Sequence, residues 1–291
     1  MTVVAIWGIE SDYGKTQGKR SLLTSLSTLS CYGRRQKFFQ NEFLTTLKLI
    51  QSGDLPSASV TGSWAGAMGQ TQFMPSTYER LAVDGDGDGR RNLITNSADA
   101  LASTANYLKR AGWREGHVWG YEVRIPKGFN ASLAGRKKRR ALSDWAHKGI
   151  VKIDGSPLPA NKEQAAILLP AGVNGPAFIV LHNFNAIYSY NASESYALAI
   201  AHLSDRLRGG TPFITPWPTN NPGLSRIDRK KLQKLLITRG YDIGKVDGLI
   251  GSATRNAIIT EQKRLGMTPQ DGRASVGILT RLQKESVTTG N

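Results

Sequence analysis

Near its start the chain reads VVAIWGIESDYG over residues 3–14. On a helix, residues three and four positions apart are neighbours. One face of this stretch would therefore carry the apolar side chains of Ile6 and Trp7, and the carboxyl of Glu10 would continue that face. Gly14, a residue type that often ends helices, follows one turn later, so Glu10 would lie near the negative end of the helix dipole. The stretch predicts a helix with an acid on its apolar side.

These surroundings predict an altered acidity for Glu10. An apolar face and a helix C-terminus both disfavour the charged form of a carboxyl, so both would raise its pKa. A carboxyl that stays protonated near neutral pH can serve as a general acid. The helical pattern alone equally allows a surface glutamate at a frayed helix end.

The composition is that of a basic globular protein. Of 291 residues, 40% are hydrophobic, and 38 Lys and Arg against 22 Asp and Glu give a formal net charge of +16. This length can hold one large domain, or a medium domain and a small one. The positive charge favours a polyanionic partner, but it does not choose among nucleic acid, an anionic membrane surface and an acidic cell-wall polymer.

Several kinds of site are excluded by the residue types present. The single cysteine, Cys31, excludes an intramolecular disulfide and a cysteine-rich metal site. The four histidines lack the spacing of a zinc-binding pair. No apolar run approaches the roughly 18 residues that span a membrane, and the first residues do not read as a signal peptide. Because a helix with a candidate catalytic residue begins almost at Met1, we expect the natural protein to have further N-terminal residues.

Ordinary helices are predicted after the opening stretch. Leucines recur at helical spacing within residues 18–30, and residues 34–51 show an amphipathic helical pattern. Pro75 marks the first turn of another helix, because proline is favoured there.

A second informative stretch, TGSWAGAMGQTQFMPSTY, covers residues 61–78. Its small residues let the backbone approach a ligand closely, and the aromatic rings of Trp64 and Phe73 offer flat faces to sugars. The side-chain amides of Gln70 and Gln72 can bind hydroxyl and acetamido groups. A tight structural turn would explain the glycines but not these side chains, so the stretch predicts a ligand cleft.

Together, the segment around Glu10 and the run GAMGQTQFMPS of residues 66–76 resemble the membrane-bound lytic transglycosylase B family. These bacterial enzymes cleave the glycan strands of peptidoglycan. The resemblance extends to about Arg208. It implies a mainly α, lysozyme-like α+β catalytic domain in which Glu10 is the sole acid and base.

The resemblance also implies the reaction and the residues that orient the substrate. Glu10 would cleave the β-1,4 bond between N-acetylmuramic acid and N-acetylglucosamine and leave a 1,6-anhydro end, with no cofactor required for the chemistry. Asp12 would face away from Glu10 on a helix, so no paired carboxylate is evident. Tyr107 alone could be a core tyrosine, and Asn191 alone could be a helix cap. The predicted substrate-binding residues are Ser63, Gln72, Tyr107, Tyr190, Asn191 and Tyr196.

The run DGDGDG of residues 84–89 has the alternating carboxylates that can converge on a hard cation. An EF-hand would place a glutamate at the twelfth position, where this chain has Thr95. The resembling family has a longer loop, closed by an acid further along, and Asp99 could take that part. Alternatively, Asn96 caps a helix over residues 97–110, and Asp99 lies in its first turn. The predicted ligands of a structural calcium or sodium ion are Asp84, Asp86, Asp88 and Asp99.

Residues 113–170 lack a clear period and are predicted to be irregular. They contain the basic run RKKRR of residues 136–140, which could bind a phosphate backbone. Because no nucleic-acid-binding motif accompanies it, we interpret it as a solvated segment or a contact with an anionic wall polymer. A helix is predicted over residues 194–207.

The C-terminal part predicts a separate module. Prolines crowd residues 209–223, which read as a semi-rigid linker. Three short helical patterns follow, separated by the turns Asp247-Gly248 and Asp271-Gly272. This spacing resembles the small three-helix peptidoglycan-binding domain of bacterial wall hydrolases. A dimerisation or packing domain is the alternative.

We therefore expect a catalytic domain over residues 1–208, a linker over 209–223 and a peptidoglycan-binding domain over 224–285. The expected partners are peptidoglycan glycan strands and anionic wall polymer, with no nucleic acid and no membrane span, for a monomer in the periplasm or cell envelope. A lysozyme-type muramidase and a non-catalytic wall-binding protein are the alternatives.

Overall fold

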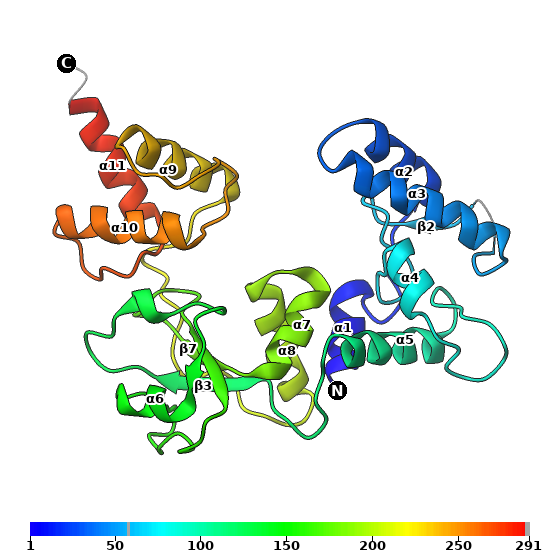
Figure 1. The fold of residues 1–291 in the computed structure, drawn as a ribbon, viewed down its shortest axis with the longest axis horizontal. Helices are drawn as coiled ribbons and strands as arrows, with labels where there is room; N and C mark the ends of the chain where they lie inside the picture. Colours follow the sequence, from blue (N-terminus) through cyan, green and yellow to red (C-terminus); the bar gives the residue numbers. More distant parts are fainter. Residues whose placement is uncertain (57–58, 289–291) are drawn as a thin grey trace. The chain divides into compact units, whose positions relative to one another are not determined.

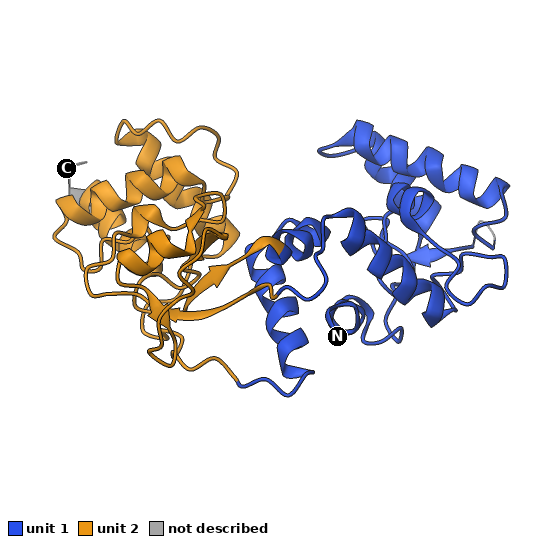
Figure 2. Ribbon diagram, turned by 60° about the horizontal axis from the view of Figure 1, so that its bottom comes forward, with its two compact units in different colours: residues 1–117, 183–211 blue, residues 118–182, 212–291 orange. Residues whose placement is uncertain are grey.

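The computed structural model describes residues 1–56 and 59–288. They belong to two compact units, one of residues 1–117 and 183–211 and the other of residues 118–182 and 212–291 (Figure 2). The described chain is mainly helical with a small sheet, which confirms the predicted fold class. None of the described helices has the length and apolar content that crossing a bilayer requires.

The first unit is built from helices (Figure 1). They are α1 (Thr2–Ser11), α2 (Leu22–Cys31), α3 (Gln36–Gln51), α4 (Pro75–Leu81), α5 (Ser97–Arg110), α7 (His182–Asn191) and α8 (Glu194–Arg206). Strands β1 (Arg20–Ser21) and β2 (Thr61–Gly62) pair antiparallel. Helix α1 packs against α8 and α5, and α3 packs against α2 and α4. The helices predicted for this unit are present.

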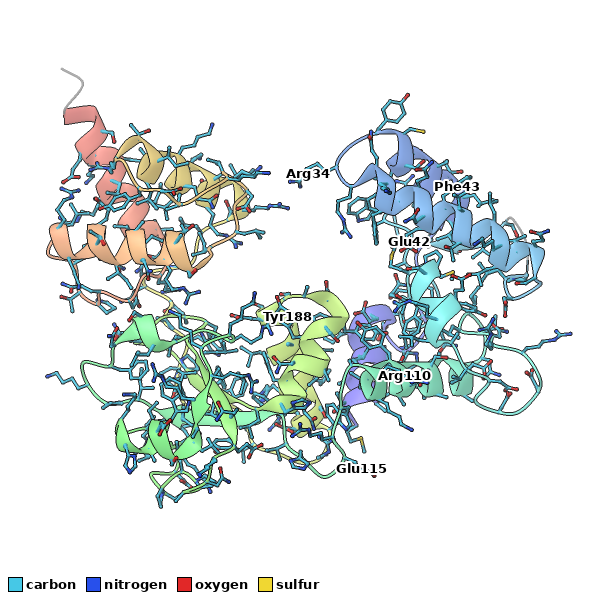
Figure 3. All side chains as sticks on the ribbon, viewed as in Figure 1. Arg34, Glu42, Phe43, Arg110, Glu115 and Tyr188 are labelled. Carbon is cyan, nitrogen blue, oxygen red and sulfur yellow. The ribbon has the colours of Figure 1, made fainter. Side chains whose placement is uncertain are left out.

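Hydrogen bonds fix the C-terminus of α1 and the N-terminus of α4. Helix α1 ends before Gly14, because Asp12 adopts the left-handed conformation at φ 47° and donates its N–H to the Gly8 carbonyl. Helix α4 begins at Pro75, and the buried carboxylate of Glu42 on α3 accepts from the Ser76 N–H at 2.8 Å and from its O–H at 2.6 Å. Figure 3 labels Glu42 on α3. The N-terminal cap of α4 is therefore supplied from another helix.

The prediction that residues 113–170 are irregular is wrong. The described residues of the second unit form an antiparallel sheet in the order β4-β6-β7-β3-β5. Its strands are β3 (Gly120–Arg124), β4 (Arg140–Ala141), β5 (Val151–Lys152), β6 (Gln164–Leu168) and β7 (Ala177–Val180), and α6 (Leu142–His147) and a 3₁₀ turn (Ala131–Leu133) accompany them. Tyr121 pairs with Ile179, and Ile167 pairs with Ile179 from the other side. Because β6 and β7 are almost wholly buried, they show no alternation of apolar and polar residues.

The basic run of residues 136–140 is only partly solvated. Arg139 is half-buried and donates to the carbonyls of Gln164 and Leu181 at 2.7 and 3.0 Å. Burial lowers the pKa of its guanidinium. Arg140 lies over the ring of Trp145, 5.8 Å from its centroid. Arg139 therefore stabilises the sheet. The interpretation from the sequence had treated the whole run as solvated or in contact with wall polymer.

The proline-rich segment is held against the sheet. The carboxylate of Glu122, which is 7% exposed, accepts from the N–H groups of Ile214 and Thr215, each at 2.8 Å. The ring of Phe213 packs on Phe178 with centroids 4.7 Å apart. These contacts hold residues 213–215 against the sheet.

Three helices follow the linker, as predicted: α9 (Arg226–Thr238), α10 (Ser252–Arg264) and α11 (Val276–Thr288). Leu232, Ile258 and Leu282 lie in their shared core. The two predicted turns are held alike. Gln233 accepts from the Gly248 N–H at 2.7 Å, and Gln262 accepts from the Gly272 N–H at 2.8 Å.

Candidate active site

Glu10 lies in the last turn of α1, and its carboxyl is half-buried. Ile6, one turn earlier, is fully buried. The Tyr196 hydroxyl donates to Glu10 Oε1 at 2.6 Å. Burial raises the pKa of Glu10 and the hydrogen bond from Tyr196 lowers it, with burial the larger effect. The expected direction of the shift is confirmed, and the frayed surface glutamate is not what the structure shows.

An aromatic cluster continues from Tyr196 into the unit. The Tyr196 ring stacks on that of Tyr190, with centroids 6.4 Å apart and planes 8° apart. Tyr190 also meets Tyr107 at 4.8 Å and Phe73 at 6.1 Å between centroids. Burial raises the pKa of both Tyr190 and Tyr196, so each stays a hydrogen-bond donor at neutral pH. Together these rings form a mainly apolar surface beside the carboxyl of Glu10.

The two outer hydroxyls of the cluster are bound to the backbone. Tyr190 donates to the Thr71 carbonyl at 2.7 Å, and Tyr107 donates to the Ser189 carbonyl at 2.8 Å. The Tyr190 bond ties the cluster to the loop of residues 61–73. The Ser11 hydroxyl, next to Glu10 in sequence, donates to the Gln70 carbonyl of the same loop. Helix α1, helix α7 and this loop therefore meet at the site.

Ser63 and Gln72 shape this loop. Ser63 Oγ accepts from the N–H groups of Ala65 and Ala67 at 3.3 and 3.0 Å. Gln72 has a φ of 54°, and its side-chain amide donates to the carbonyls of Gln17 and Gly69 at 3.0 and 2.9 Å. A Cβ on Gly62 would lie 2.3 Å from the Ala67 carbonyl oxygen, so the turn requires glycine there. Both predicted side chains are half-buried and available only in part to a ligand.

The structure thus joins Glu10, Tyr196, Tyr190 and Tyr107 through direct contacts. Ser63 and Gln72 lie on the loop that this group contacts. Asn191 is exposed at the end of α7 and follows Tyr190 in sequence.

Sequence reasoning missed two residues that support the site. Thr71 is fully buried, accepts from Tyr190 and has a hydroxyl without a partner among the described residues. Gln17 accepts from Gln72 and donates to the carbonyls of Gly14 and Ile94 at 3.1 and 2.9 Å. Thr71 lay within the predicted cleft stretch, whereas no pattern in the sequence marked Gln17.

The acidic loop has a cluster that fits a cation. One carboxylate oxygen from each of Asp84, Asp86 and Asp99 lies within 4.8 Å of the others, and the structure does not bring Asp88 into this group. Asp99 is fully buried and accepts from the N–H groups of Gly85 and Asn92 at 2.7 and 2.6 Å. Three converging carboxylates are a donor set that suits calcium.

The helix-cap interpretation is confirmed, and Asp99 as a cation ligand stays a prediction. Asn96 Oδ1 accepts from the N–H groups of Ala98 and Asp99 at 2.9 and 3.3 Å, so it caps α5 as expected. Asn96 also donates to Asp86 Oδ2 at 2.6 Å. Backbone hydrogen bonds from Gly89 and Gly87 lower the pKa of Asp84 and keep it anionic.

Comparisons with known proteins match most of the chain. Residues 1–205 match the transglycosylase SLT domain family, and residues 225–282 match a peptidoglycan binding domain family. Membrane-bound lytic murein transglycosylase B of Escherichia coli (strain K12) is 37% identical over 208 residues, which are 69% of this chain and 55% of that protein. The chain therefore spans little more than half the length of this curated relative.

Solved structures give the same result. SltB3 from Pseudomonas aeruginosa, in complex with NAG-anhNAM-pentapeptide, is 50% identical with a TM-score of 0.92, covering 97% of this chain and 76% of that one. Escherichia coli Slt35 in complex with calcium is 34% identical with a TM-score of 0.63, covering 71% of this chain and 65% of that one. The chain belongs to the transglycosylase SLT domain family.

Proposed function

We propose that this chain is a lytic transglycosylase that cleaves the β-1,4 bond between N-acetylmuramic acid and N-acetylglucosamine in peptidoglycan and leaves 1,6-anhydromuramoyl ends. The observation that carries this proposal is the setting of Glu10. Its carboxyl is half-buried, its pKa is raised, and one of its oxygens is bound by Tyr196. Membership of the SLT domain family supports the same reaction.

In this proposal Glu10 acts first as acid and then as base. Because Tyr196 donates to Oε1, the catalytic proton resides on Oε2. Glu10 gives this proton to the glycosidic oxygen as the bond to the muramoyl C1 breaks. The carboxylate then takes the proton of the same sugar's 6-hydroxyl while that oxygen bonds to C1. The proton returns to Glu10, and no water is consumed.

A single carboxylate suits this sequence of steps. Retaining glycosidases place a second carboxyl about 5–5.5 Å from the acid. Asp12, two residues after Glu10, is exposed and lies 3.6 Å from Lys15. We infer that the acetamido oxygen of the substrate stabilises the cationic centre instead.

The substrate-binding roles of Ser63, Gln72, Tyr107, Tyr190, Asn191 and Tyr196 remain part of this proposal. The hydroxyls of Tyr107 and Tyr190 are bound to the backbone, so these residues would offer their rings to a sugar. Tyr196 would in addition set the orientation of Glu10.

The acidic loop is proposed to hold a structural calcium ion, with Asp84, Asp86 and Asp99 as ligands. Their convergence supports this, as does the calcium complex of Slt35. The ion would neutralise the loop carboxylates and order the segment before α5. It takes no part in the reaction.

We propose peptidoglycan strands as the partner, with residues 225–282 binding the wall, and the periplasm or cell envelope as the location. The name of the Escherichia coli relative, a membrane-bound murein enzyme, supports the location. The net charge of +16 would favour contact with anionic wall polymer.

The test is mass spectrometry of purified peptidoglycan digested by the parent chain, Glu10→Gln and Glu79→Gln. Glu79 is an exposed acid on α4, so it controls for the loss of one charge. We expect products one water lighter than those of hydrolysis from the parent and Glu79→Gln, and none from Glu10→Gln. Hydrated ends would identify a muramidase. A wall-bound parent that releases nothing would be a non-catalytic binding protein.

A further inference from the structure

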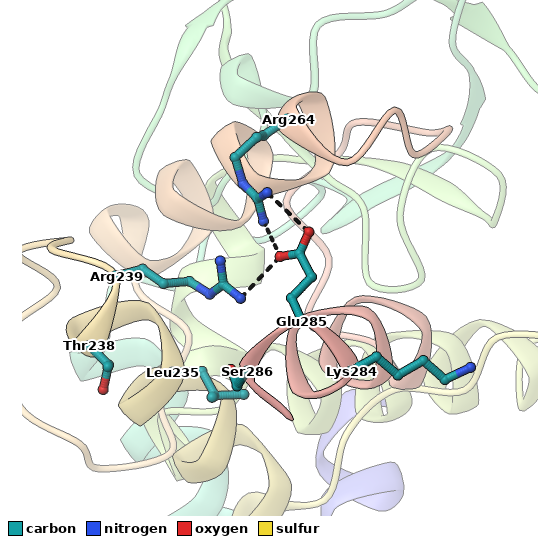
Figure 4. Close-up of a pocket in the computed structure, with 7 residues that line it drawn as sticks. All are labelled: Leu235, Thr238, Arg239, Arg264, Lys284, Glu285 and Ser286. Carbon is teal, nitrogen blue, oxygen red and sulfur yellow. Dashed lines mark hydrogen bonds and ion pairs between the residues drawn. The ribbon is translucent and has the colours of Figure 1, made fainter. Parts of the chain in front are cut away.

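The C-terminal three-helix domain contains a cavity of about 710 Å³ (Figure 4). The cavity lies where the three helices approach their ends. Arg239 follows the last residue of α9, Arg264 is the last residue of α10, and Lys284 and Glu285 lie near the end of α11. Three basic side chains and one acidic side chain line it, so its lining is net positive.

Glu285 sits between the two arginines. Arg264 Nη1 and Nη2 donate to its two oxygens at 3.1 and 2.5 Å, and Arg239 Nη2 lies 3.0 Å from its Oε2. A guanidinium fork with two parallel bonds is the preferred arrangement for binding a carboxylate. The two arginines are therefore already oriented to bind a carboxylate.

A second acid, Glu261, has a different role in this cluster. Its side chain is 3% exposed, whereas that of Glu285 is 35% exposed. Glu261 accepts from Arg264 Nε and Nη2 at 3.0 and 2.7 Å and from the Tyr241 hydroxyl at 2.8 Å. The hydrogen bonds to Glu261 thus fix the orientation of the Arg264 guanidinium. Glu285 is the more exposed of the two acids, so it is the one that a ligand carboxylate would displace.

We propose that this cavity binds a carboxylate group of a peptidoglycan stem peptide, and that Glu285 occupies the position of that carboxylate in the unbound chain. The inference rests on peptidoglycan being the partner. On binding, the ligand takes over the hydrogen bonds from Arg264 and Arg239, and Glu285 turns to solvent. Stem peptides carry several carboxylates, whereas glycan hydroxyls do not require paired guanidinium groups.

The test is calorimetric titration of the full chain with the soluble pentapeptide of peptidoglycan, and with the same peptide after its carboxylates are amidated. Glu285→Gln removes the competing charge and should bind the pentapeptide about 3–10-fold more tightly than the parent, while Arg264→Gln should bind it at least about 10-fold more weakly. The amidated peptide should bind weakly to every form.

Two matched controls come from a charge pair elsewhere in the domain. Asp228 and Lys231 on α9 lie 2.9 Å apart, outside the cavity lining. Asp228→Asn makes the same charge change as Glu285→Gln, and Lys231→Gln makes the same change as Arg264→Gln. Both controls should bind like the parent.

A Glu285→Gln variant that binds no more tightly than the parent overturns the inference, as does equal binding of the amidated peptide. An unfolded domain cannot produce a gain in affinity, so this arm stands even where Arg264→Gln destabilises the domain. Release of anhydro products is measured on the same preparations. Intact release with failed peptide titrations refutes this site alone, whereas absent release from the parent refutes the proposed reaction.

Discussion

At the site, two effects of opposite sign act on one carboxyl. Burial raises the pKa of Glu10, and the Tyr196 hydrogen bond partly offsets this by favouring the carboxylate. A residue that must both give and take a proton benefits from such a balance. The two partners are separated by 186 positions in the chain.

Removing the Tyr196 hydroxyl should change the pH profile in a defined direction. Tyr196→Phe removes the interaction that lowers the pKa of Glu10, so that pKa rises further. The basic limb of the activity profile, where the acid loses its proton, should move to higher pH, and kcat should fall by about tenfold or more because the carboxyl is less well oriented.

Tyr107→Phe is the control for this profile, because its hydroxyl binds the Ser189 carbonyl and not Glu10. Its basic limb should stay in place. An unshifted basic limb in Tyr196→Phe would contradict the role assigned to the hydrogen bond.

The raised pKa of Glu10 also predicts that the stability of the fold depends on pH. Because burial raises the pKa of Glu10 above its ordinary 4.5, the folded chain binds this proton more tightly than the unfolded chain, and stability is lost as pH rises through the folded pKa. Glu10→Gln does not titrate and keeps an acceptor for Tyr196. The melting temperature of Glu10→Gln relative to that of the parent should therefore rise as the pH increases from 4.5 to the folded pKa of Glu10, and level off above it.

Differential scanning calorimetry across that range, with Glu79→Gln as the exposed control, measures the difference. A gap that stays constant with pH would show that Glu10 is not destabilised as a carboxylate.

At the level of elements, the local pattern predicted helices well and strands poorly. Helix α5 has the predicted bounds and the predicted Asn96 cap, because capping and period are local properties of the sequence. Strands β4 and β5 have two residues each, and β6 and β7 are apolar runs, so neither length nor alternation marked them. The sheet is specified by pairing between distant segments.

The residues of the site also divide into those that the sequence marked and those that only contacts between distant residues reveal. The apolar stripe marked Glu10, and the resemblance marked its tyrosine neighbours. Spacing could not reveal that Thr71 supplies the carbonyl that holds Tyr190, because this contact joins residues 119 positions apart.

The acidic loop gives a prediction for ligand binding. Calcium at about 100 times its Kd should raise the melting temperature of the first unit by about 5–10 °C, and a chelator should reverse this. Asp84→Asn should abolish the response, because Asp84 is one of the converging carboxylates.

Asp88→Asn removes the same charge from the same loop and is the matched control, since Asp88 lies outside that group. It should keep most of the response. A melting temperature that does not depend on calcium in the parent would refute the cation site, and an equal loss in both variants would refute this ligand set.

At the scale of the whole molecule, the second unit joins a sheet, a proline-rich segment and three helices that match a peptidoglycan binding domain family. The domain boundaries at residues 208 and 224 stay predictions. The proline-rich segment is anchored to the sheet, because the Glu122 carboxylate accepts hydrogen bonds from two of its N–H groups. These two hydrogen bonds hold Ile214 and Thr215 next to strand β3.

Breaking this contact should expose the linker. Glu122→Ala leaves two backbone donors without their acceptor, and chymotrypsin should then cut after Phe213 or Trp217 about tenfold faster, because proteolysis follows the local opening equilibrium. Asp154→Ala, which removes an exposed acid of the same unit, should be cut at the parental rate. Equal rates for Glu122→Ala and the parent would mean that the linker is held by other contacts.

Digestion in water labelled with a heavy oxygen isotope distinguishes formation of the 1,6-anhydro bond by Glu10 from hydrolysis. We predict that the new muramoyl ends have the same mass in labelled and ordinary water, and that Glu10→Gln releases none. Incorporation of the heavy isotope at those ends would refute the transglycosylase reaction and identify a hydrolase.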